Sequence, residues 1–265
     1  MQPVFKTILR QLLPKKLFDS LRKWRNGVRT RSKARKKAFA FNQFVKYNGL
    51  IIRQGPFAGI KYLSEASGSE LLPKLIGCYE SELHVVIDEI ILARYDRIID
   101  IGCAEGYYAV GLAYRCPWAK VEAYDIDREA RLKCQTMASL NSVTRNFELK
   151  AKFDVGDFVA MDNLSTLILC DCEGAEHELF GKSDASRWQD CDLLIELHDA
   201  VHPGTTASII ANLASSHNIR LIDSRDPRSE DIPSLWFLKN RFDRRLAVSE
   251  ERFPMQWAWL TRRSN

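Results

Sequence analysis

The sequence predicts an α/β fold in which a mostly parallel sheet is covered by helices on both faces. Two observations carry this prediction: short apolar runs recur along the chain, and helical patterns lie between most of them. The runs are continuous rather than alternating, as in strands buried on both faces of a parallel sheet. The strand-like runs are residues 97–101, 120–124, 147–152, 166–170, 192–197 and 219–223, and the closing stretch MQWAWLTRR adds a seventh. The clearest helical patterns are residues 106–115, 128–140 and 205–215.

Two further segments precede these elements. Residues 48–63 predict two short strands around the turn at Gly55-Pro56, and residues 68–93 predict a helix. We therefore expect three parts. The first is a basic amphipathic helical extension at 1–47, the second is a lead-in at 48–95 that caps the core, and the third is the core itself at 96–265.

Composition narrows the class of protein. Hydrophobic residues make up 46% of the chain, as in ordinary globular proteins. No uninterrupted apolar run reaches the length of a membrane span, and the first residues lack the pattern of a cleaved signal peptide. The seven cysteines are odd in number and scattered, which favours reduced thiols in a core. We expect a cytoplasmic protein, with peripheral association at the inner membrane face as a candidate.

Charge is distributed very unevenly. Residues 1–40 hold 13 Lys/Arg and one acid, Asp19, for a formal charge of +12, whereas the remainder carries −7. Such asymmetry suggests contact with a polyanion or an anionic membrane. An amphipathic basic helix can lie in a membrane interface, but it can equally dock on its own domain with a solvated charged face. The apolar positions of its two helical patterns are Val4, Phe5, Ile8, Leu9 and Leu12, then Leu17, Phe18, Leu21 and Trp24.

A glycine turn follows the first core strand. It reads Asp100-Ile-Gly102-Cys-Ala104-Glu105-Gly106. Gly102 allows a sharp turn, and the small residues at 104 and 106 leave room for a ligand near the start of the next helix. The spacing is G-x-A-x-G, which differs from the G-x-G-x-x-G of dinucleotide sites. An acid, Asp125, ends the second strand, where a carboxylate can accept both hydroxyls of a ribose.

This combination resembles the first motifs of class I methyltransferases that use S-adenosylmethionine (SAM). The resemblance implies a Rossmann-like class I methyltransferase fold with a seven-stranded sheet and, here, a basic helical N-terminal extension. It also implies that the turn wraps the amino-acid part of SAM and that Asp100 helps to hold its ammonium group. The predicted cofactor-binding residues are Asp100, Gly102, Ala104, Glu105, Gly106, Asp125, Ile126 and Asp171.

A third motif, LILCDCEGAEHELF at 167–180, follows the fourth strand. It resembles the D-x-E-G-x-E motif of FkbM-type methyltransferases, mainly O-methyltransferases of sugars and secondary metabolites. The stretch DLLIELHD at 192–199 resembles the fifth strand of that group, so the resemblance covers roughly residues 95–223. The chain departs from the group at Cys103-Ala104-Glu105, where Ala-Asn is usual.

Four polar residues are candidates for the chemistry: Asp171, Glu173, Glu196 and His198. Asp171 and Glu173 are two positions apart, as are Glu196 and His198. Each pair therefore projects to one side of an extended strand, and neighbouring strands would bring all four residues to one sheet edge. A hydroxyl acceptor needs a base, and we expect His198 or Glu173 in that role. Carboxylates and histidine can also bind a divalent ion, but no pattern requires one and we predict none. Glu176 is explained by the dipole of the following helix.

We therefore expect a SAM-dependent methyltransferase that O-methylates a hydroxyl of a sugar, a glycan or a related small metabolite. The chain lacks the [DNS]-P-P-[YF] tetrapeptide of amino-methylating nucleic-acid enzymes after its fourth strand. One alternative is an RNA methyltransferase whose basic N-terminus holds phosphates. Another is a non-catalytic interaction protein with the same fold. A glycan or small-molecule acceptor and an anionic membrane surface contacted by residues 1–40 are the expected partners, and RNA is the less favoured one.

Overall fold

The computed structural model describes residues 15–158, 164–225, 227, 232–250 and 254–263. The apolar stripe predicted over residues 3–13 lies outside the described residues. By its internal contacts the chain divides into two compact units, and each is described by itself. Unit 1 comprises residues 1–47 and 229–247, and unit 2 comprises 48–228 and 248–265. The three-part division predicted from the sequence, with boundaries after residues 47 and 95 and with 229–247 inside the core, stays a prediction.

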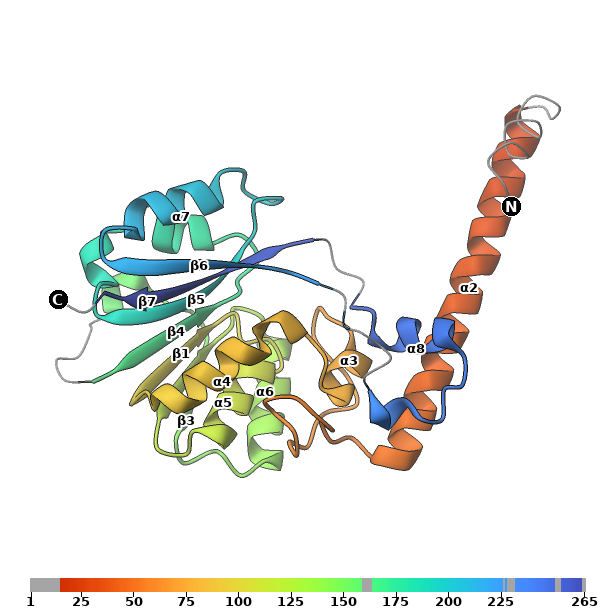
Figure 1. Cartoon of the computed structure of the whole chain (residues 1–265), viewed down its shortest axis with the longest axis horizontal. Helices are drawn as coiled ribbons and strands as arrows, with labels where there is room; N and C mark the ends of the chain where they lie inside the picture. Colours follow the sequence, from red (N-terminus) through yellow and green to blue (C-terminus); the bar gives the residue numbers. More distant parts are fainter. Residues whose placement is uncertain (1–14, 159–163, 226, 228–231, 251–253, 264–265) are drawn as a thin grey trace. The chain divides into compact units, whose positions relative to one another are not determined.

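Unit 2 is built on a seven-stranded sheet of order β3-β2-β1-β4-β5-β7-β6 (Figure 1). The first five strands run parallel, and β7 is antiparallel to both of its neighbours. This confirms the predicted fold class, a mostly parallel seven-stranded sheet covered by helices. The strands are β1 (Arg97–Ile101), β2 (Lys120–Tyr124), β3 (Phe147–Lys150), β4 (Thr166–Cys170), β5 (Cys191–Leu197), β6 (His217–Asp223) and β7 (Gln256–Arg262).

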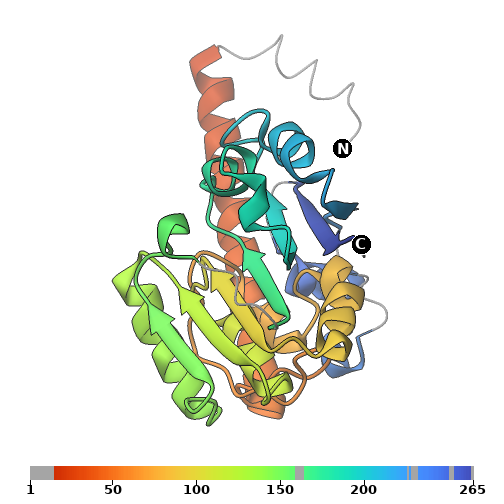
Figure 2. The ribbon, with the colours of Figure 1, turned by 90° about the vertical axis from the view of Figure 1, so that its left-hand side faces the viewer.

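Helices cover both faces of this sheet, as Figures 1 and 2 show. One face carries α4 (His84–Ala93), α5 (Tyr107–Arg115) and α6 (Arg128–Leu140). The other carries α7 (Thr205–Leu213) and the short turns η3 (His177–Gly181) and η4 (Ala185–Arg187). Strands β1, β4 and β5 are almost completely buried, as their uninterrupted apolar runs require. Because β1, β2, β4 and β5 run parallel, their carboxyl ends lie at the same edge of the sheet.

The lead-in at 48–95 differs from its prediction in two places. The two expected strands form a single bridge between Ile51 and Lys61. The expected helix at 68–93 is broken into α3 (Leu71–Ile76), η1 (Ser81–Leu83) and α4. Gly77 ends α3 with a left-handed φ of 85°, and a Cβ there would lie 1.9 Å from the carbonyl oxygen of Gln54. The break is therefore set by a close backbone approach that periodicity does not reveal.

Unit 1 consists of a long helix and a short segment from far along the chain. The helix α2 spans Lys15–Asn48, and the returning segment contains η6 (Pro233–Leu235) and α8 (Arg241–Val248). Lys36 Nζ lies 2.7 Å from Asp243 Oδ1 and 4.9 Å from the centre of the Phe242 ring. In the described part of the chain, no helix is long and apolar enough to cross a membrane.

Candidate functional site

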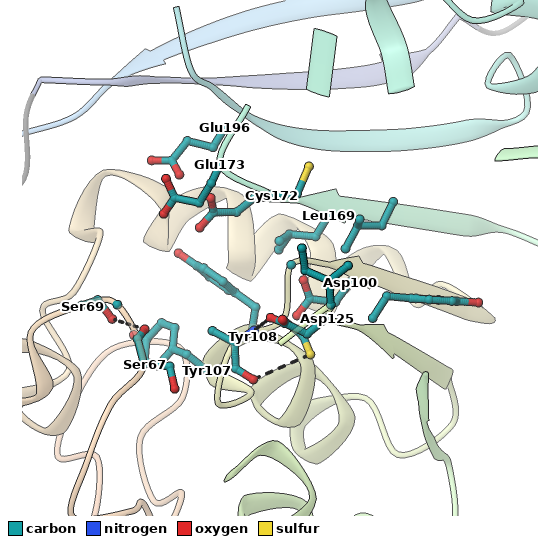
Figure 3. Close-up of a pocket in the computed structure, with 18 of the residues that line it drawn as sticks. Ser67, Ser69, Asp100, Tyr107, Tyr108, Asp125, Leu169, Cys172, Glu173 and Glu196 are labelled. Carbon is teal, nitrogen blue, oxygen red and sulfur yellow. Dashed lines mark hydrogen bonds between the residues drawn. The ribbon is translucent and has the colours of Figure 1, made fainter. Parts of the chain in front are cut away.

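A cavity of about 530 Å³ opens in unit 2 at the carboxyl ends of the central strands (Figure 3). This is where ligands bind in open α/β sheets. Among the residues predicted for the site, those lining the cavity are Asp100, Gly102, Ala104, Asp125, Ile126, Asp171, Glu173 and Glu196. Glu105, Gly106 and His198 lie outside its lining. The structure thus gathers most of the predicted cofactor and catalytic residues around one space.

Asp100 is the most unusual group in the cavity. Its side chain comes from β1 and is 1% exposed, and no cation or side-chain donor among the described residues pairs with its oxygens. Burial, followed by the charge of Asp171, raises the pKa of Asp100 to about 8, although the Ala109 backbone partly opposes this. A buried carboxylate without a counter-charge is costly, so a cationic ligand would relieve it.

The glycine turn after β1 is tightly packed against the protein. Gly102 has a φ of 87°, and a Cβ there would lie 1.7 Å from the carbonyl oxygen of Asp171. A Cβ at Gly106 would lie 2.8 Å from Val110 Cγ2 and 2.9 Å from Cys134 Sγ. We expected the small residues to make room for a ligand. The structure shows that the two glycines first of all allow the turn to pack against β4 and the helices.

Asp125 joins the turn to the end of β2. Its Oδ2 accepts a hydrogen bond from the Ala104 backbone N–H at 2.8 Å, and its Oδ1 accepts one from Asp127 at 2.7 Å. Ala104 itself has a left-handed φ of 47°, a conformation that this hydrogen bond helps to hold. Each carboxylate oxygen keeps a further lone pair. Asp125 can therefore accept ligand hydroxyls, with the highly exposed side chain of Ile126 beside it.

The Glu105 side chain makes its contacts with other residues of the protein and not with the cavity. We expected it among the cofactor residues, but it is completely buried and does not line the cavity. Its carboxylate accepts hydrogen bonds from Tyr62 Oη and Lys74 Nζ, both at 2.6 Å, and from the Ser67 N–H at 3.0 Å. Burial would raise the pKa of Glu105, but Lys74 and the hydrogen bonds to the carboxylate together hold that pKa below its usual range. Glu105 thus ties the lead-in segment to the glycine turn.

The four candidate catalytic groups come together as predicted. His198 Nε2 lies 3.5 Å from Glu173 Oε2, 3.5 Å from Glu196 Oε2 and 3.8 Å from Asp171 Oδ1. The reason is the parallel pairing of β4 and β5, which aligns Cys170 with Ile195 and brings the two strand ends together. Glu173 is largely exposed, whereas His198 and Glu196 are buried.

Glu176 is the close partner of His198, a role that we did not predict from the sequence. Its Oε1 lies 3.0 Å from His198 Nδ1. The same completely buried carboxylate accepts hydrogen bonds from the backbone N–H groups of Cys172 and Gly174, at 2.9 and 2.8 Å. The helix dipole gave Glu176 a sufficient explanation in the sequence. The signal that could have found it is the final acid of the D-x-E-G-x-E motif.

Burial and charge act in opposite directions within this cluster. Burial raises the pKa of Asp171. For His198, burial lowers the pKa, but the carboxylate of Glu176, 3.0 Å from Nδ1, outweighs it and raises the pKa overall. The converse holds for Glu176, whose pKa falls because His198 outweighs the effect of burial. The pair therefore favours an imidazolium facing a carboxylate, with Nε2 directed at the other three acids.

The described residues also contain donor sets that suit a metal ion. Asp171, Glu196 and His198 place one ligand atom each within 4.8 Å of one another, as do His177, Glu178 and His202. Carboxylate and imidazole donors suit several divalent ions. Our expectation that the reaction uses no metal remains a prediction.

No family model matches the chain, and neither does any curated protein. Solved structures similar to it include a Klebsiella pneumoniae protein provisionally assigned as an O-methyltransferase, with 11% identity and a TM-score of 0.47 over 69% of this chain and 80% of that one. Another is the O-methyltransferase TomG of Streptomyces achromogenes, involved in tomaymycin synthesis and solved with SAM. It has 13% identity and a TM-score of 0.45 over 75% and 83%. A third is the precorrin-6y C5,15-methyltransferase of Geobacter metallireducens, with 12% identity and a TM-score of 0.44 over 66% and 87%.

Proposed function

We propose that this chain is a SAM-dependent methyltransferase that methylates a hydroxyl of a sugar, a glycan or a related small metabolite. One observation carries the proposal. The buried carboxylate of Asp100, which has no counter-charge among the described residues, and the carboxylate of Asp125 line the same cavity, together with the glycine turn.

The chemistry of these two groups fits SAM. Asp100 would pair with the α-ammonium of the cofactor, which supplies the missing positive charge. Asp125, at the end of β2, would accept hydrogen bonds from the ribose hydroxyls. The exposed Ile126 beside it offers apolar surface to the adenine ring.

When bound, SAM supplies a methyl carbon on a sulfonium, and the carbon–sulfur bond breaks as the acceptor oxygen bonds to that carbon, leaving the electron pair on sulfur. The side chains must align the acceptor and take its proton. We assign to Asp171 the role of accepting the proton of the acceptor hydroxyl. Asp171 lines the cavity, and burial raises its pKa toward that of a useful base. Glu173 and Glu196 line the same wall and would orient the acceptor.

In our proposal, His198 does not touch the acceptor and acts through the carboxylates that line the cavity. We expected His198 or Glu173 to be the base, but His198 is 2% exposed and outside the cavity lining. Glu176 holds its Nδ1, so the charge at Nε2 stabilises the three carboxylates that face the acceptor. His198 is thus a positioning residue, because it acts through the carboxylates.

We also assign the chain to the FkbM-type group within these enzymes. What supports this assignment is that the acids of the D-x-E-G-x-E stretch and His198 form one cluster. The assignment favours a sugar or secondary-metabolite acceptor over RNA. An anionic membrane beside residues 1–40 would suit an acceptor carried on a lipid or a surface glycan.

Calorimetric titration with SAM tests the proposal. The wild type should bind, and Asp125→Asn should weaken binding roughly tenfold or more, because a charged hydrogen-bond partner of the ribose is lost. Asp127→Asn is the matched control. Asp127 is exposed, caps α6 by accepting from the Glu129 N–H, and does not line the cavity.

Two results would contradict the proposal: no heat of binding at millimolar SAM, or an equal loss in both variants. Binding without methyl transfer to any glycan or small-molecule fraction would instead favour the non-catalytic alternative.

A further inference from the structure

Unit 1 exposes several large apolar side chains. Val28, Phe39, Tyr47, Trp236 and Phe242 are each between 47% and 61% exposed. They come from two segments about 200 residues apart in the sequence, α2 and the stretch before and within α8. Large apolar side chains exposed together mark an interaction surface more often than a chance arrangement.

The contacts within unit 1 place four of these side chains along one side of α2. Positions 36, 39, 43 and 47 follow each other at intervals of three and four, which is the spacing of one helix face. Lys36 on this face contacts the Phe242 ring and Asp243, and the Tyr47 ring lies 5.0 Å from that of Trp236. We call Phe39, Tyr47, Trp236 and Phe242 the aromatic face; α8 lies beside α2 in Figure 1.

The charge of unit 1 is the second observation. Its residues include 18 Lys/Arg and four Asp/Glu, a formal charge of +14, whereas the remaining residues, unit 2, carry −9. The net positive charge therefore lies in the part of the chain that also exposes the aromatic face. Arg31 and Arg35, one turn apart on α2, are both exposed.

We infer that the aromatic face of unit 1 binds the surface of an anionic lipid bilayer. Trp and Tyr rings favour the headgroup level, Phe can enter the acyl boundary, and each basic residue near the surface adds attraction to anionic lipid. The inference extends the expectation for residues 1–40, because the returning segment supplies two of the four aromatic anchors. It goes beyond the proposed reaction and stands independently of it.

Lipid is favoured over RNA by the kind of side chain exposed. Single-stranded RNA also combines phosphates with stacked bases, and Trp236 or Tyr47 could stack on a base. The exposed Val28, however, cannot stack on a base. Phe39 and Phe242 have no polar group that could form a hydrogen bond with a base. Their apolar surface is explained by insertion into a bilayer.

The test is flotation of the full-length chain with vesicles of phosphatidylglycerol and phosphatidylcholine, and with vesicles of phosphatidylcholine alone. We expect binding to the anionic vesicles only. Trp236→Ala with Phe242→Ala should weaken it about tenfold, and so should Arg31→Gln with Arg35→Gln. Matched controls in unit 2 are Val85→Ala with Leu92→Ala and Arg128→Gln with Arg145→Gln, all at exposed positions. These controls should bind like the wild type.

Absence of vesicle binding by the wild type would overturn the inference. So would an equal loss in the unit 2 controls, or an aromatic double variant that binds anionic vesicles as tightly as the wild type does. Tighter binding to a single-stranded RNA oligonucleotide than to vesicles, lost with Arg31 and Arg35, would assign the surface to RNA instead. Circular dichroism and SAM titration on each variant separate this result from misfolding and from failure of the proposed reaction.

Discussion

At the scale of single residues, Asp100 lowers the stability of the folded chain but suits the binding of a cation. Its pKa of about 8 in the folded chain lies far above the ordinary value of 3.8. An acid whose pKa is raised on folding destabilises the protein as pH rises from its unfolded pKa toward its folded pKa. The chain therefore keeps a group that costs stability at neutral pH, which is characteristic of functional sites.

The same residue should make the proposed SAM binding depend on pH. Below about pH 8 the free protein holds Asp100 protonated, whereas an ammonium partner requires the ionised form. Binding at pH 7 should therefore release close to one proton, and the affinity should rise almost tenfold from pH 6 to pH 7. Calorimetry in two buffers of different ionisation enthalpy measures the released proton. Asp100→Asn should abolish the release and weaken binding while raising the thermal midpoint at pH 8; an unchanged proton count would refute the ammonium contact.

The pairing of His198 with Glu176 is a feature of the site that could not be predicted from the sequence. The types and spacing of Asp171, Glu173, Glu196 and His198 were enough to predict that they meet, because parallel strands end at one edge. The pairing of His198 with Glu176 depends on the loop after β4 turning back on itself, with Glu173 at a left-handed φ of 57°. That turn is a property of the packed loop, and no periodicity encodes it.

At the scale of elements, the strands of the core were the most predictable part of the chain. The predicted limits of β1, β2 and β4 agree with the structure residue for residue, because a turn or loop begins directly after each of them, at Gly102, Asp125 and Asp171. Segments whose conformation depends on distant partners were not predicted. The lead-in is held by the contact of Lys74 with Glu105 and by the close approach of Gly77 to Gln54. The helix α8 belongs to a unit whose other helix lies about 200 residues earlier.

The turn between β1 and α5 gives a prediction that separates two costs of substituting a glycine: the strain of a left-handed φ and the steric collision of the added Cβ. Gly102 and Gly204 both have left-handed φ angles, of 87° and 90°, but a Cβ at 204 would meet nothing within 4 Å. Gly204→Ala should therefore cost only the backbone penalty, about 1–2 kcal/mol of unfolding free energy. Gly102→Ala adds a collision with the Asp171 carbonyl and should cost about 3 kcal/mol or more, with loss of SAM binding. Urea denaturation measures both costs, and equal costs would contradict the close approach of the turn to β4.

At the scale of the whole molecule, the net charge has opposite signs in the two units. Unit 2 is acidic and presents its carboxylates to a cavity suited to a cationic cofactor, whereas unit 1 is basic and presents aromatic rings. The sequence showed the basic segment but gave no sign that residues 229–247 join it. That grouping arises from contacts such as Lys36 with Asp243, which connect positions more than 200 residues apart.

Stability of the whole molecule in acid should depend on one buried carboxylate in the sheet. Glu122 on β2 lies 2.8 Å from Arg97 Nε and 2.7 Å from Lys150 Nζ, so it links β1, β2 and β3. Burial alone would raise the pKa of Glu122, but its hydrogen bonds and these two cations outweigh it and lower the pKa to about 2. Because the pKa is depressed on folding, the stabilisation is complete above the unfolded value of 4.5 and is lost as pH falls toward 2.

Glu122→Gln should consequently lower the free energy of unfolding by about 3 kcal/mol at pH 7, which is what a pKa depression of this size is worth. The difference from wild type should shrink between pH 4.5 and pH 2, because the wild-type carboxylate loses its charge there. Glu148→Gln is the matched control. Glu148 lies near Lys120 and Lys150 but is half exposed, so its ion pairs are screened and its loss should change stability little. Chemical denaturation at several pH values measures both variants, and a pH-independent loss in Glu122→Gln would mean that packing rather than charge holds the three strands together.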